Sequence, residues 1–362
     1  MPEHGCGVGA RGVTSGLSTR VGAVGLSCMS HRLLCFGLLL GAAAPAAQAL
    51  VEHKVEKKFA VPVAGAVLAV DTFTGAVTVT ECDGNTIEIT VTEQCDEPDE
   101  KAAAAKFADL DLAFNQDAAG HVAVTASYRQ KVSFTWKKWP PVVLVFDIKV
   151  PRHCDANLTT GNGDITIGKL RGKLLTTNDS GKIFVGETDG TVTARSRTGE
   201  IGLTACTGMI EVTTLTGNIS IGRALGGARL ASDGGDIEVQ QAGGDFRVNG
   251  NGSQVKVRFA YPLVQAANVM TSGGSIVAIF DQRSAAMVSA SCAVLEKVVS
   301  RGLKSAGLPD GETRSRLTAK LNDGGPVVTL SASGGSVLLR GEPPGPEVDV
   351  VKAAPAKVDV AK

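Results

Sequence analysis

Aromatic side chains are scarce in this chain, and several other features that would place it in a familiar class are missing. Of 362 residues only 11 are Phe, 2 are Tyr and 2 are Trp, which argues against a bulky aromatic core. Lys+Arg and Asp+Glu total 36 each, so net charge gives no support to a nucleic-acid partner. Glycine is abundant instead, at 44 residues, which favours a turn-rich, all-β chain.

Cysteine and histidine are too scattered to build a common site. Once an export signal is removed, five cysteines remain: Cys82, Cys95, Cys154, Cys206 and Cys292. Their odd number and wide spacing leave the disulfide pairing open. The histidines lack a zinc spacing, and although His153 adjoins Cys154, neighbours on a strand point to opposite faces. We expect no metal and no other cofactor.

The first 49 residues are expected to be an export signal. His31 and Arg32 precede an apolar run at 33–40, and the small residues of 47–49 (AQA) supply a cleavage site. Met29 is an alternative start of translation. No later apolar run reaches the roughly 20 residues of a membrane helix. The mature chain is therefore expected in the periplasm, at the cell surface or in the medium, without a transmembrane helix.

The stretch TGNGDITIG at 160–168 resembles a glycine-rich nucleotide-binding loop. In a dinucleotide-binding loop a third glycine and the start of a helix should follow. Here Thr166 stands in place of the third glycine, and the β-branched Ile165 and Ile167 stand where the helix should begin. The nucleotide interpretation is therefore weak.

A repeat of 18 residues explains the same stretch. Its first column is glycine: Gly163, Gly181, Gly199, Gly217 and Gly235. Two places later comes isoleucine: Ile165, Ile183, Ile201, Ile219 and Ile237. Halfway through each unit a second glycine precedes a second apolar alternation: Gly172, Gly190, Gly208, Gly226 and Gly244. Each unit is thus two nine-residue halves with strand periodicity.

This repeat predicts a β-solenoid in which the glycines make turns and the isoleucines form an inner stack. We expect five parts: an export signal at 1–49, an N-terminal β region at 50–159 with a short outer helix near 99–109, the regular solenoid body at 160–258, irregular C-terminal coils at 259–341, and a disordered tail at 342–362. Residues 292–303 fit either a helix or an irregular strand, and the handedness of the coil stays open.

Four short segments, in order along the chain, strengthen this interpretation: FDIKVP at 146–151, LTTGNGDI at 158–165, LNDGGP at 321–326 and SGGSV at 333–337. Together they resemble the bacterial putative-adhesin domain family over roughly residues 61–340. The resemblance implies an exported β-solenoid of unknown function with no catalytic residues to carry over. The chain departs from the family pattern at 292–303, where a glycine-led strand is expected.

The candidate ligand surface is the aromatic and basic stretch 127–141, which contains Trp136, Lys137, Lys138 and Trp139. Exposed tryptophans stack on sugar rings and lysines reach anionic groups. The alternative is burial, since Trp136 shares its parity with Tyr128 and Phe134, and the three side chains would then cover an open end of the solenoid or pack beneath the helix at 99–109.

A mixed-charge column directly follows the repeat glycines: Asp164, Lys182, Glu200, Asn218 and Asp236. Glycosidase chemistry needs two carboxyl groups about 5–9.5 Å apart. Lys182 separates Asp164 from Glu200, however, and alternating signs indicate cross-strand pairing.

We therefore expect a non-enzymatic, exported β-solenoid, adhesin-like or scaffolding in the envelope, with a repetitive surface that binds a cell-envelope glycan or another surface protein. The alternative is a polysaccharide-active β-helix enzyme that uses surface carboxylates. The oligomeric state stays open.

Overall fold

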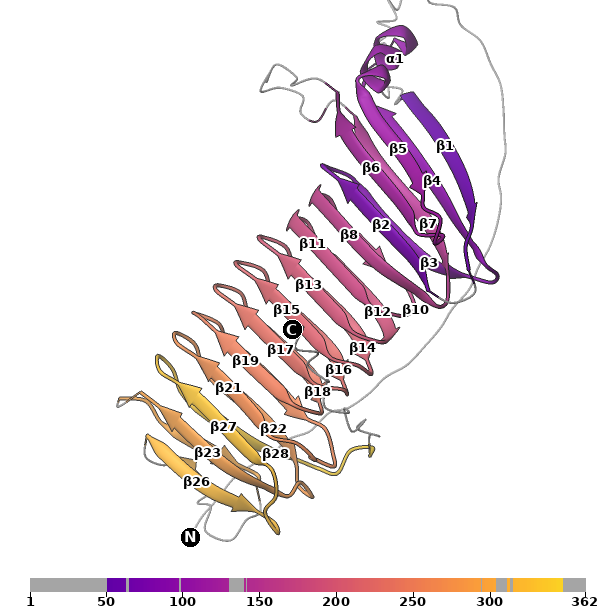
Figure 1. Cartoon of the computed structure of the whole chain (residues 1–362). Coiled ribbons are helices and arrows are strands. Elements are labelled where there is room, and N and C mark those ends of the chain that lie inside the picture. The colour runs from indigo at the N-terminus through magenta and orange to yellow at the C-terminus, as the bar shows by residue number, and fades with distance from the viewer. Residues whose placement is uncertain are drawn as a thin grey trace, which may run out of the picture. The chain divides into compact units, whose positions relative to one another are not determined.

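The computed structural model describes residues 51–62, 65–97, 99–129, 140, 142–293, 295–303, 311–312 and 315–347. They all belong to one unit, Gln48–Lys362. Within this part of the chain two sheets face each other, and one short helix lies beside them (Figure 1). The prediction of an all-β chain with a short helix is confirmed. None of the described helical residues forms a segment long and apolar enough to cross a membrane.

The two sheets take alternate strands from the chain. Sheet A contains, in spatial order, β1 (Val51–Ala60), β4 (Thr86–Cys95), β7 (Val143–Pro151), β3 (Ala76–Cys82), β9 (Ile165–Ile167), β12 (Ile183–Asp189), β14 (Ile201–Cys206), β16 (Ile219–Ala224), β18 (Ile237–Ala242), β20 (Val255–Phe259), β22 (Ile276–Asp281), β28 (Val337–Glu342), β24 (Val298–Arg301) and β25 (Gly311–Glu312), with β10 (Leu170–Arg171) beside β12. Sheet B contains β26 (Arg316–Leu321), β23 (Ala286–Cys292), β27 (Val327–Ala332), β21 (Ala267–Thr271), β19 (Phe246–Gly250), β17 (Ala228–Ser232), β15 (Ile210–Thr214), β13 (Val192–Ser196), β11 (Leu174–Ser180), β8 (Cys154–Asn162), β2 (Ala66–Thr72), β6 (Val122–Tyr128) and β5 (Leu110–Gln116).

The middle of both sheets is parallel, and partners lie 18 positions apart. In sheet A, Ile183 pairs with Ile165 on one side and Ile201 on the other. In sheet B, Val192 pairs in the same way with Leu174 and Ile210. The sequence period thus equals one passage through both sheets, and equivalent residues of successive coils form columns across the strands.

The core lies between the sheets and is mainly aliphatic. The five repeat isoleucines have at most 1% of their surface exposed: Ile165, Ile183, Ile201, Ile219 and Ile237. The apolar residues of the opposite half-repeats are buried as well, as Val192, Ile210 and Phe246 illustrate. Burying one such side chain is worth about 1.5–3 kcal/mol, so each coil gains its stability by covering its neighbours.

The repeat glycines are required because successive coils approach closely. A Cβ added to Gly217 would collide with the carbonyl oxygen of Gly199, and one added to Gly199 would collide with that of Gly181. Gly163 and Gly181 also have positive φ values of 145° and 123°, which favour glycine. Close contact between backbones, in addition to turn conformation, explains the glycine column.

A column of small polar side chains is buried where the sheet B strands end: Thr160, Asn178, Ser196, Thr214 and Ser232. They satisfy the backbone of the glycine turns. Asn178 donates through Nδ2 to the carbonyl oxygen of Gly163 at 2.8 Å, and the backbone N–H of Gly199 donates to Ser196 Oγ at 2.9 Å. Buried backbone groups need such partners, so these side chains stabilise the turns from within.

At both ends, the order of coils in space differs from their order in the chain. β2 and β3 lie between the pair β6 and β7 and the pair β8 and β9, and near the other end β27 and β28 lie inside β23 and β24. Antiparallel strands then flank the outermost coils: β4, β1 and β5 at one end, and β26 and β25 at the other. Such strands help to cover sheet edges that would otherwise pair with other chains.

Three sequence expectations concern the segments outside the regular body. Helix α1 runs over Glu100–Ala108, and the side chain of its N-cap residue Asp99 accepts a hydrogen bond from the N–H of Lys101 at 3.2 Å. Residues 292–303 contain the strand β24, which pairs in parallel with β28. Residues 342–347, at the start of the expected tail, lie against the end of sheet A, whereas the export signal and residues 348–362 lie outside the described residues.

Candidate functional site

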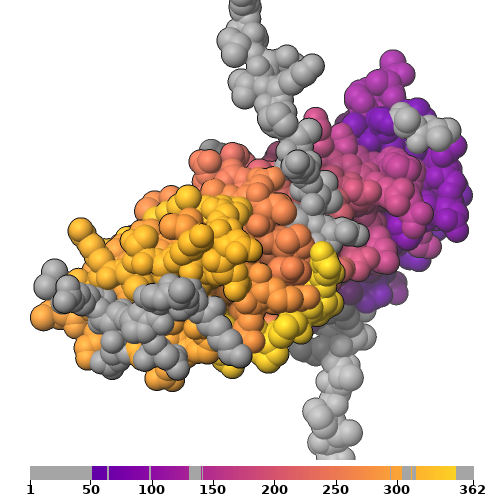
Figure 2. Space-filling view, turned by 90° about the horizontal axis from the view of Figure 1, so that it is seen from below, coloured from indigo at the N-terminus to yellow at the C-terminus, as the bar shows by residue number. Residues whose placement is uncertain are grey.

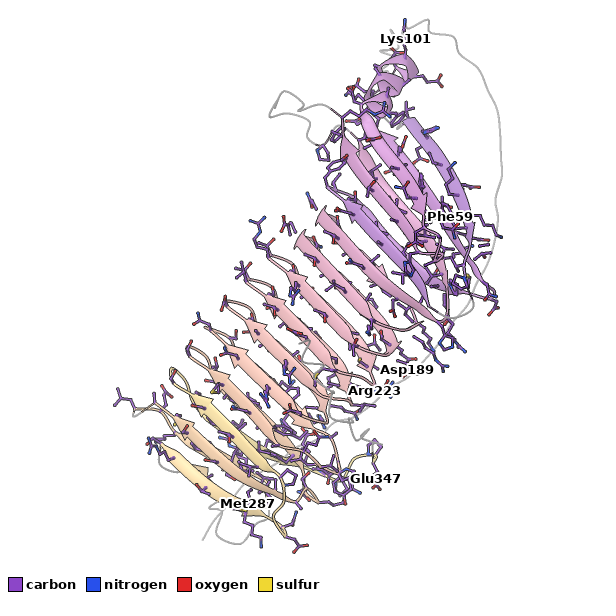
Figure 3. All side chains as sticks on the ribbon, viewed as in Figure 1. Phe59, Lys101, Asp189, Arg223, Met287 and Glu347 are labelled. Carbon is purple, nitrogen blue, oxygen red and sulfur yellow. The ribbon has the colours of Figure 1, made fainter. Side chains whose placement is uncertain are left out.

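Three hollows lie along the stack on the outer side of sheet A, over its strands and their ends, and neighbouring hollows share a lining residue. The proximal hollow has a volume of about 330 Å³, the middle hollow about 630 Å³ and the distal hollow about 70 Å³. Arg223 lines both the proximal and the middle hollow, and Arg258 lines both the middle and the distal hollow. Asp189, Arg223 and Glu347 are found along the same edge of the stack in Figure 3. We call the three hollows together the groove.

The groove exists because small residues recur at the bend of the sheet A strands. One column contains Gly168, Gly186, Thr204 and Gly222, and the next contains Ala205. A Cβ added to Gly222 would collide with the carbonyl oxygen of Thr204. Strand β12 also loses its regular pairing with β14 at Gly186, between Val185 and Glu187. The bend and the missing side chains leave space that longer residues on either side enclose.

The proximal hollow is organised around Glu187. Lys169 Nζ lies 3.0 Å from Glu187 Oε2, and Arg223 Nη2 lies 3.5 Å from Glu187 Oε1. Ala205 lies between Glu187 and Arg223 in the strand register. Because Ala205 is short, the Arg223 side chain reaches Glu187 from two coils away. Two cations therefore share one carboxylate.

Further ion pairs line the same hollow. Arg171 Nε lies 3.6 Å from Asp189 Oδ2, and Thr207 donates its hydroxyl hydrogen to Asp189 Oδ1 at 2.7 Å. Arg152 Nε lies 3.4 Å from Glu81 Oε2. These side chains are largely exposed, so each pair contributes little to stability. Their charged atoms remain accessible to a ligand.

The C-terminal segment borders the distal end of the groove. Arg258 pairs with Glu342. Asp281 accepts from Arg283 Nη2 at 2.8 Å and from the N–H of Gly345 at 2.9 Å, and Arg283 also donates to the Gly345 carbonyl at 2.7 Å. The Arg283 guanidinium lies 4.0 Å from the centroid of the Tyr261 ring. Residues 342–347 are thus held against the end of sheet A. Figure 2 shows the C-terminal strands in orange and yellow.

Two acids of the groove, Glu187 and Asp281, are held in their charged form. The hydrogen bond and charge of Lys169, with a further contribution from Arg223, lower the pKa of Glu187 below its usual value. Hydrogen bonds from Arg283 lower the pKa of Asp281 to about 2. A general acid needs a raised pKa, so these two groups are poorly suited to protonate a leaving group.

Burial raises the pKa of the Cys206 thiol, which lines the proximal hollow, to about 11, so it is a poor nucleophile at neutral pH.

The mixed-charge column predicted from the sequence is a set of links between coils. Asp164 Oδ1 accepts from the backbone N–H of Lys182 at 2.8 Å, and Lys182 Nζ lies 3.2 Å from Glu200 Oε2. One coil further along, Asn218 Oδ1 accepts from the N–H of Asp236 at 2.9 Å. These side chains are engaged with neighbouring coils and do not converge in a cleft.

The remaining candidates from the sequence are the aromatic stretch, the cysteines and the histidines. Trp136, Lys137, Lys138 and Trp139 lie outside the described residues. None of the five cysteines that the structure describes forms a disulfide. His153 is exposed while Cys154 is buried, and burial raises the pKa of the Cys154 thiol to about 12. Within the described ranges, no cluster of three or more His, Cys, Asp or Glu residues is arranged to hold a metal ion.

The candidate sites predicted from the sequence did not include the groove residues, which stand outside the columns next to the repeat glycines. A usable signal was present: Lys169, Glu187, Ala205 and Arg223 follow one another at the same period of 18. The small residues Gly168, Gly186 and Gly222 mark the bend one place earlier. The period shows that these residues share columns, but not that the strand bends there to open a hollow.

No family model matches the chain, and no curated protein matches it. Several solved structures are similar to it. A putative adhesin from Parabacteroides distasonis is 12% identical with a TM-score of 0.35, covering 79% of this chain and 97% of that chain. A putative adhesin from Bacteroides fragilis is 10% identical with a TM-score of 0.32, covering 80% and 97%. A putative lipid binding protein from P. distasonis is 10% identical with a TM-score of 0.34, covering 80% and 96%.

Proposed function

We propose that this chain is a non-enzymatic, adhesin-like binding protein, exported to the cell envelope or surface, whose groove holds an extended polar polymer of the envelope. The observation that carries the proposal is the continuity of the groove, whose successive hollows share Arg223 and Arg258. A shallow channel that crosses many coils suits a chain-like ligand better than a compact molecule. Paired cations and carboxylates along it offer both donors and acceptors to hydroxyl-rich sugars.

The charge states of Glu187 and Asp281 support binding over catalysis. Glu187 is held ionised by two cations, and Asp281 is tied to Arg283. Retaining or inverting glycosidases need one protonated and one ionised carboxyl group facing each other across the scissile bond. We therefore do not propose a polysaccharide-cleaving enzyme. The aromatic stretch with Trp136 and Trp139 remains a second proposed contact surface for the same kind of ligand.

A screen of envelope polysaccharides against the purified mature chain tests this proposal. Thr204 is exposed and lines the middle hollow, so Thr204→Trp should obstruct the groove and weaken binding at least tenfold. Thr213 is exposed on β15 of sheet B, and Thr213→Trp is the matched control. Trp136→Ala and Trp139→Ala test the aromatic stretch separately. A ligand that binds equally well to all four variants would overturn both contact surfaces.

A further inference from the structure

The charges in the groove are unevenly distributed, and this identifies a ligand class. The proximal and middle hollows are lined by six cations: Arg152, Lys169, Arg171, Arg223, Lys256 and Arg258. Only four carboxylates line the same two hollows: Glu81, Glu187, Asp189 and Glu238. The chain as a whole has equal numbers of basic and acidic residues, 36 of each. Arg258 pairs with a fifth carboxylate, Glu342, outside the two hollows, so among the described residues the six cations exceed their carboxylate partners by one.

Arg223 is the central cation of this region. It lines both larger hollows, and 48% of its side chain is exposed. Its carboxylate partner Glu187 already pairs at shorter distance with Lys169. Two positive charges against one negative charge leave an excess of one, and a guanidinium binds a carboxylate through two parallel hydrogen bonds. The neighbouring Gly222 and Ala205 leave room for such a group to approach.

Carboxylates lie among the cations of the groove, as Glu187 does beside Lys169 and Arg223 and Glu238 does beside Lys256, and this limits how densely the ligand is charged. Lys169 follows β9, and Arg223 lies on β16, three strands further along sheet A; Arg258 lies on β20, two strands beyond β16. Strands about 4.8 Å apart separate these backbone positions by roughly 14 Å and 10 Å. The charged atoms of Lys169 and Arg223 lie closer together than that, because Lys169 Nζ and Arg223 Nη2 lie 3.0 Å and 3.5 Å from the two oxygens of the Glu187 carboxylate. Duplex DNA carries a charge every ~1.7 Å, and so dense an array of phosphates would also approach Glu187 and Glu238. A polysaccharide whose carboxylates are separated by uncharged sugars would bring fewer anions close to these two acids.

We propose that the ligand of the groove is an acidic polysaccharide with widely spaced carboxylates, and that Arg223 is the main anchor for one of them. This inference rests on the proposed function of the groove and adds the chemistry of its ligand. Lys169 and Arg171 bind the polymer on one side of the anchor, and Lys256 and Arg258 bind it on the other. The acidic residues Asp281 and Glu342 mark the distal end of the basic region.

The test compares hyaluronate, which has one carboxylate per disaccharide, with its uncharged methyl ester, using immobilised polymer and the mature chain. We expect binding to hyaluronate that falls as salt is raised and is at least tenfold weaker for the ester. Arg223→Gln should weaken binding to hyaluronate about tenfold, which corresponds to about 1.4 kcal/mol. The matched control is Arg247→Gln, because Arg247 also pairs with one carboxylate, that of Asp245, but on sheet B.

A second variant is expected to change the affinity for hyaluronate in the opposite direction. Glu187→Gln removes the carboxylate that Lys169 and Arg223 share, so binding to hyaluronate should become several-fold tighter. It also guards against misfolding, since a damaged protein would not gain affinity. Melting curves of all variants should match the wild type within a few degrees.

The outcomes separate this inference from the proposed function. If the ester binds as well as hyaluronate and Arg223→Gln is silent, while Thr204→Trp still abolishes binding, the groove is a binding site but not for an acidic polymer. If single-stranded DNA binds more tightly than hyaluronate, the assignment to a polysaccharide is wrong. If no envelope polymer binds, or if one binds and Thr204→Trp changes nothing, the proposed function itself fails.

Discussion

The backbone N–H of Gly217 donates a hydrogen bond to the hydroxyl oxygen of Thr214, at 3.0 Å, inside the stack. Thr214 has only 1% of its surface exposed. The hydroxyl thus takes the place of water for a turn that the coils enclose. Equivalent contacts recur one coil away in each direction, from Gly199 to Ser196 and from Gly235 to Ser232.

Thr214→Val should destabilise the protein, because valine keeps the shape of threonine but leaves the N–H of Gly217 without its partner. We expect a loss of about 1–3 kcal/mol in the free energy of unfolding, measured by urea denaturation. Thr176→Val is the matched control. Thr176 is equally buried, and its hydroxyl oxygen makes no hydrogen bond within the described part of the chain. That control should be neutral or stabilising, and equal losses in both variants would contradict the role given to the hydroxyl.

Gly217→Ala tests the close approach of successive coils. The added methyl group would collide with the carbonyl oxygen of Gly199, so either the coils separate or the turn moves. We expect a loss of about 3 kcal/mol or more in the free energy of unfolding. At Gly345 an added Cβ meets nothing within 4 Å, so Gly345→Ala should be nearly silent. A wild-type melting temperature for Gly217→Ala would show that the coils are not in contact there.

Ile201→Asp tests the inward register of the central coil. Ile201 is 1% exposed and pairs with Ile183 and Ile219. A buried carboxylate without a cation should cost more than about 4 kcal/mol, seen as insoluble expression or loss of the cooperative melting transition. The control, Ser220→Asp, places the same charge on the exposed face of β16. Should the two variants melt alike, the assignment of inner and outer faces would be wrong.

The Asp281–Arg283 pair should make stability depend on pH in the acidic range. The folded-state pKa of Asp281 is lowered to about 2, below the ordinary value of about 3.9. A depressed pKa adds stability that is fully present above about pH 4 and is lost as the pH falls toward 2. Asp281→Asn should therefore lower stability by about 1–2 kcal/mol at pH 6, and the difference from wild type should shrink by pH 2.

Chemical denaturation at several pH values measures this effect. Asp233 is exposed in the turn before β18, and Asp233→Asn serves as the control for removing an exposed carboxylate elsewhere on the stack. A difference for Asp281→Asn that grows as the pH falls would reverse the expected sign.

Buried thiols should resist alkylation in the folded protein. Burial raises the pKa of Cys154 to about 12 and that of Cys206 to about 11, so very little thiolate is present at pH 8. We expect iodoacetamide to modify both at least about a hundredfold more slowly than an ordinary exposed thiol with a pKa of about 8.5. Mass spectrometry of protein labelled before and after denaturation gives the rates. Rapid native-state labelling of Cys154 would contradict its burial.

Much of the regular body could be predicted because a period of 18 assigns each residue to a column. The glycines, isoleucines and alternating charges at 163–167 and their equivalents fall on turns, core and surface from periodicity alone. The order of the strands at the two ends of the stack could not be predicted in this way. Nothing local in β2, β3, β27 or β28 shows that these strands are placed inside neighbouring coils, since strand order depends on competition between distant partners.

The candidate site, too, was only partly predictable from the sequence. The sequence by itself determined the length of a coil, the strands of its two halves and the side chains that stack within it, because short-range alternation and a fixed period dictate which residues face inward. Only the tertiary structure decided that Glu81, Arg152, Arg223 and Arg258 meet along one groove. These residues come from separate coils, and a hollow depends on where the strands bend and how the stacked backbones are spaced.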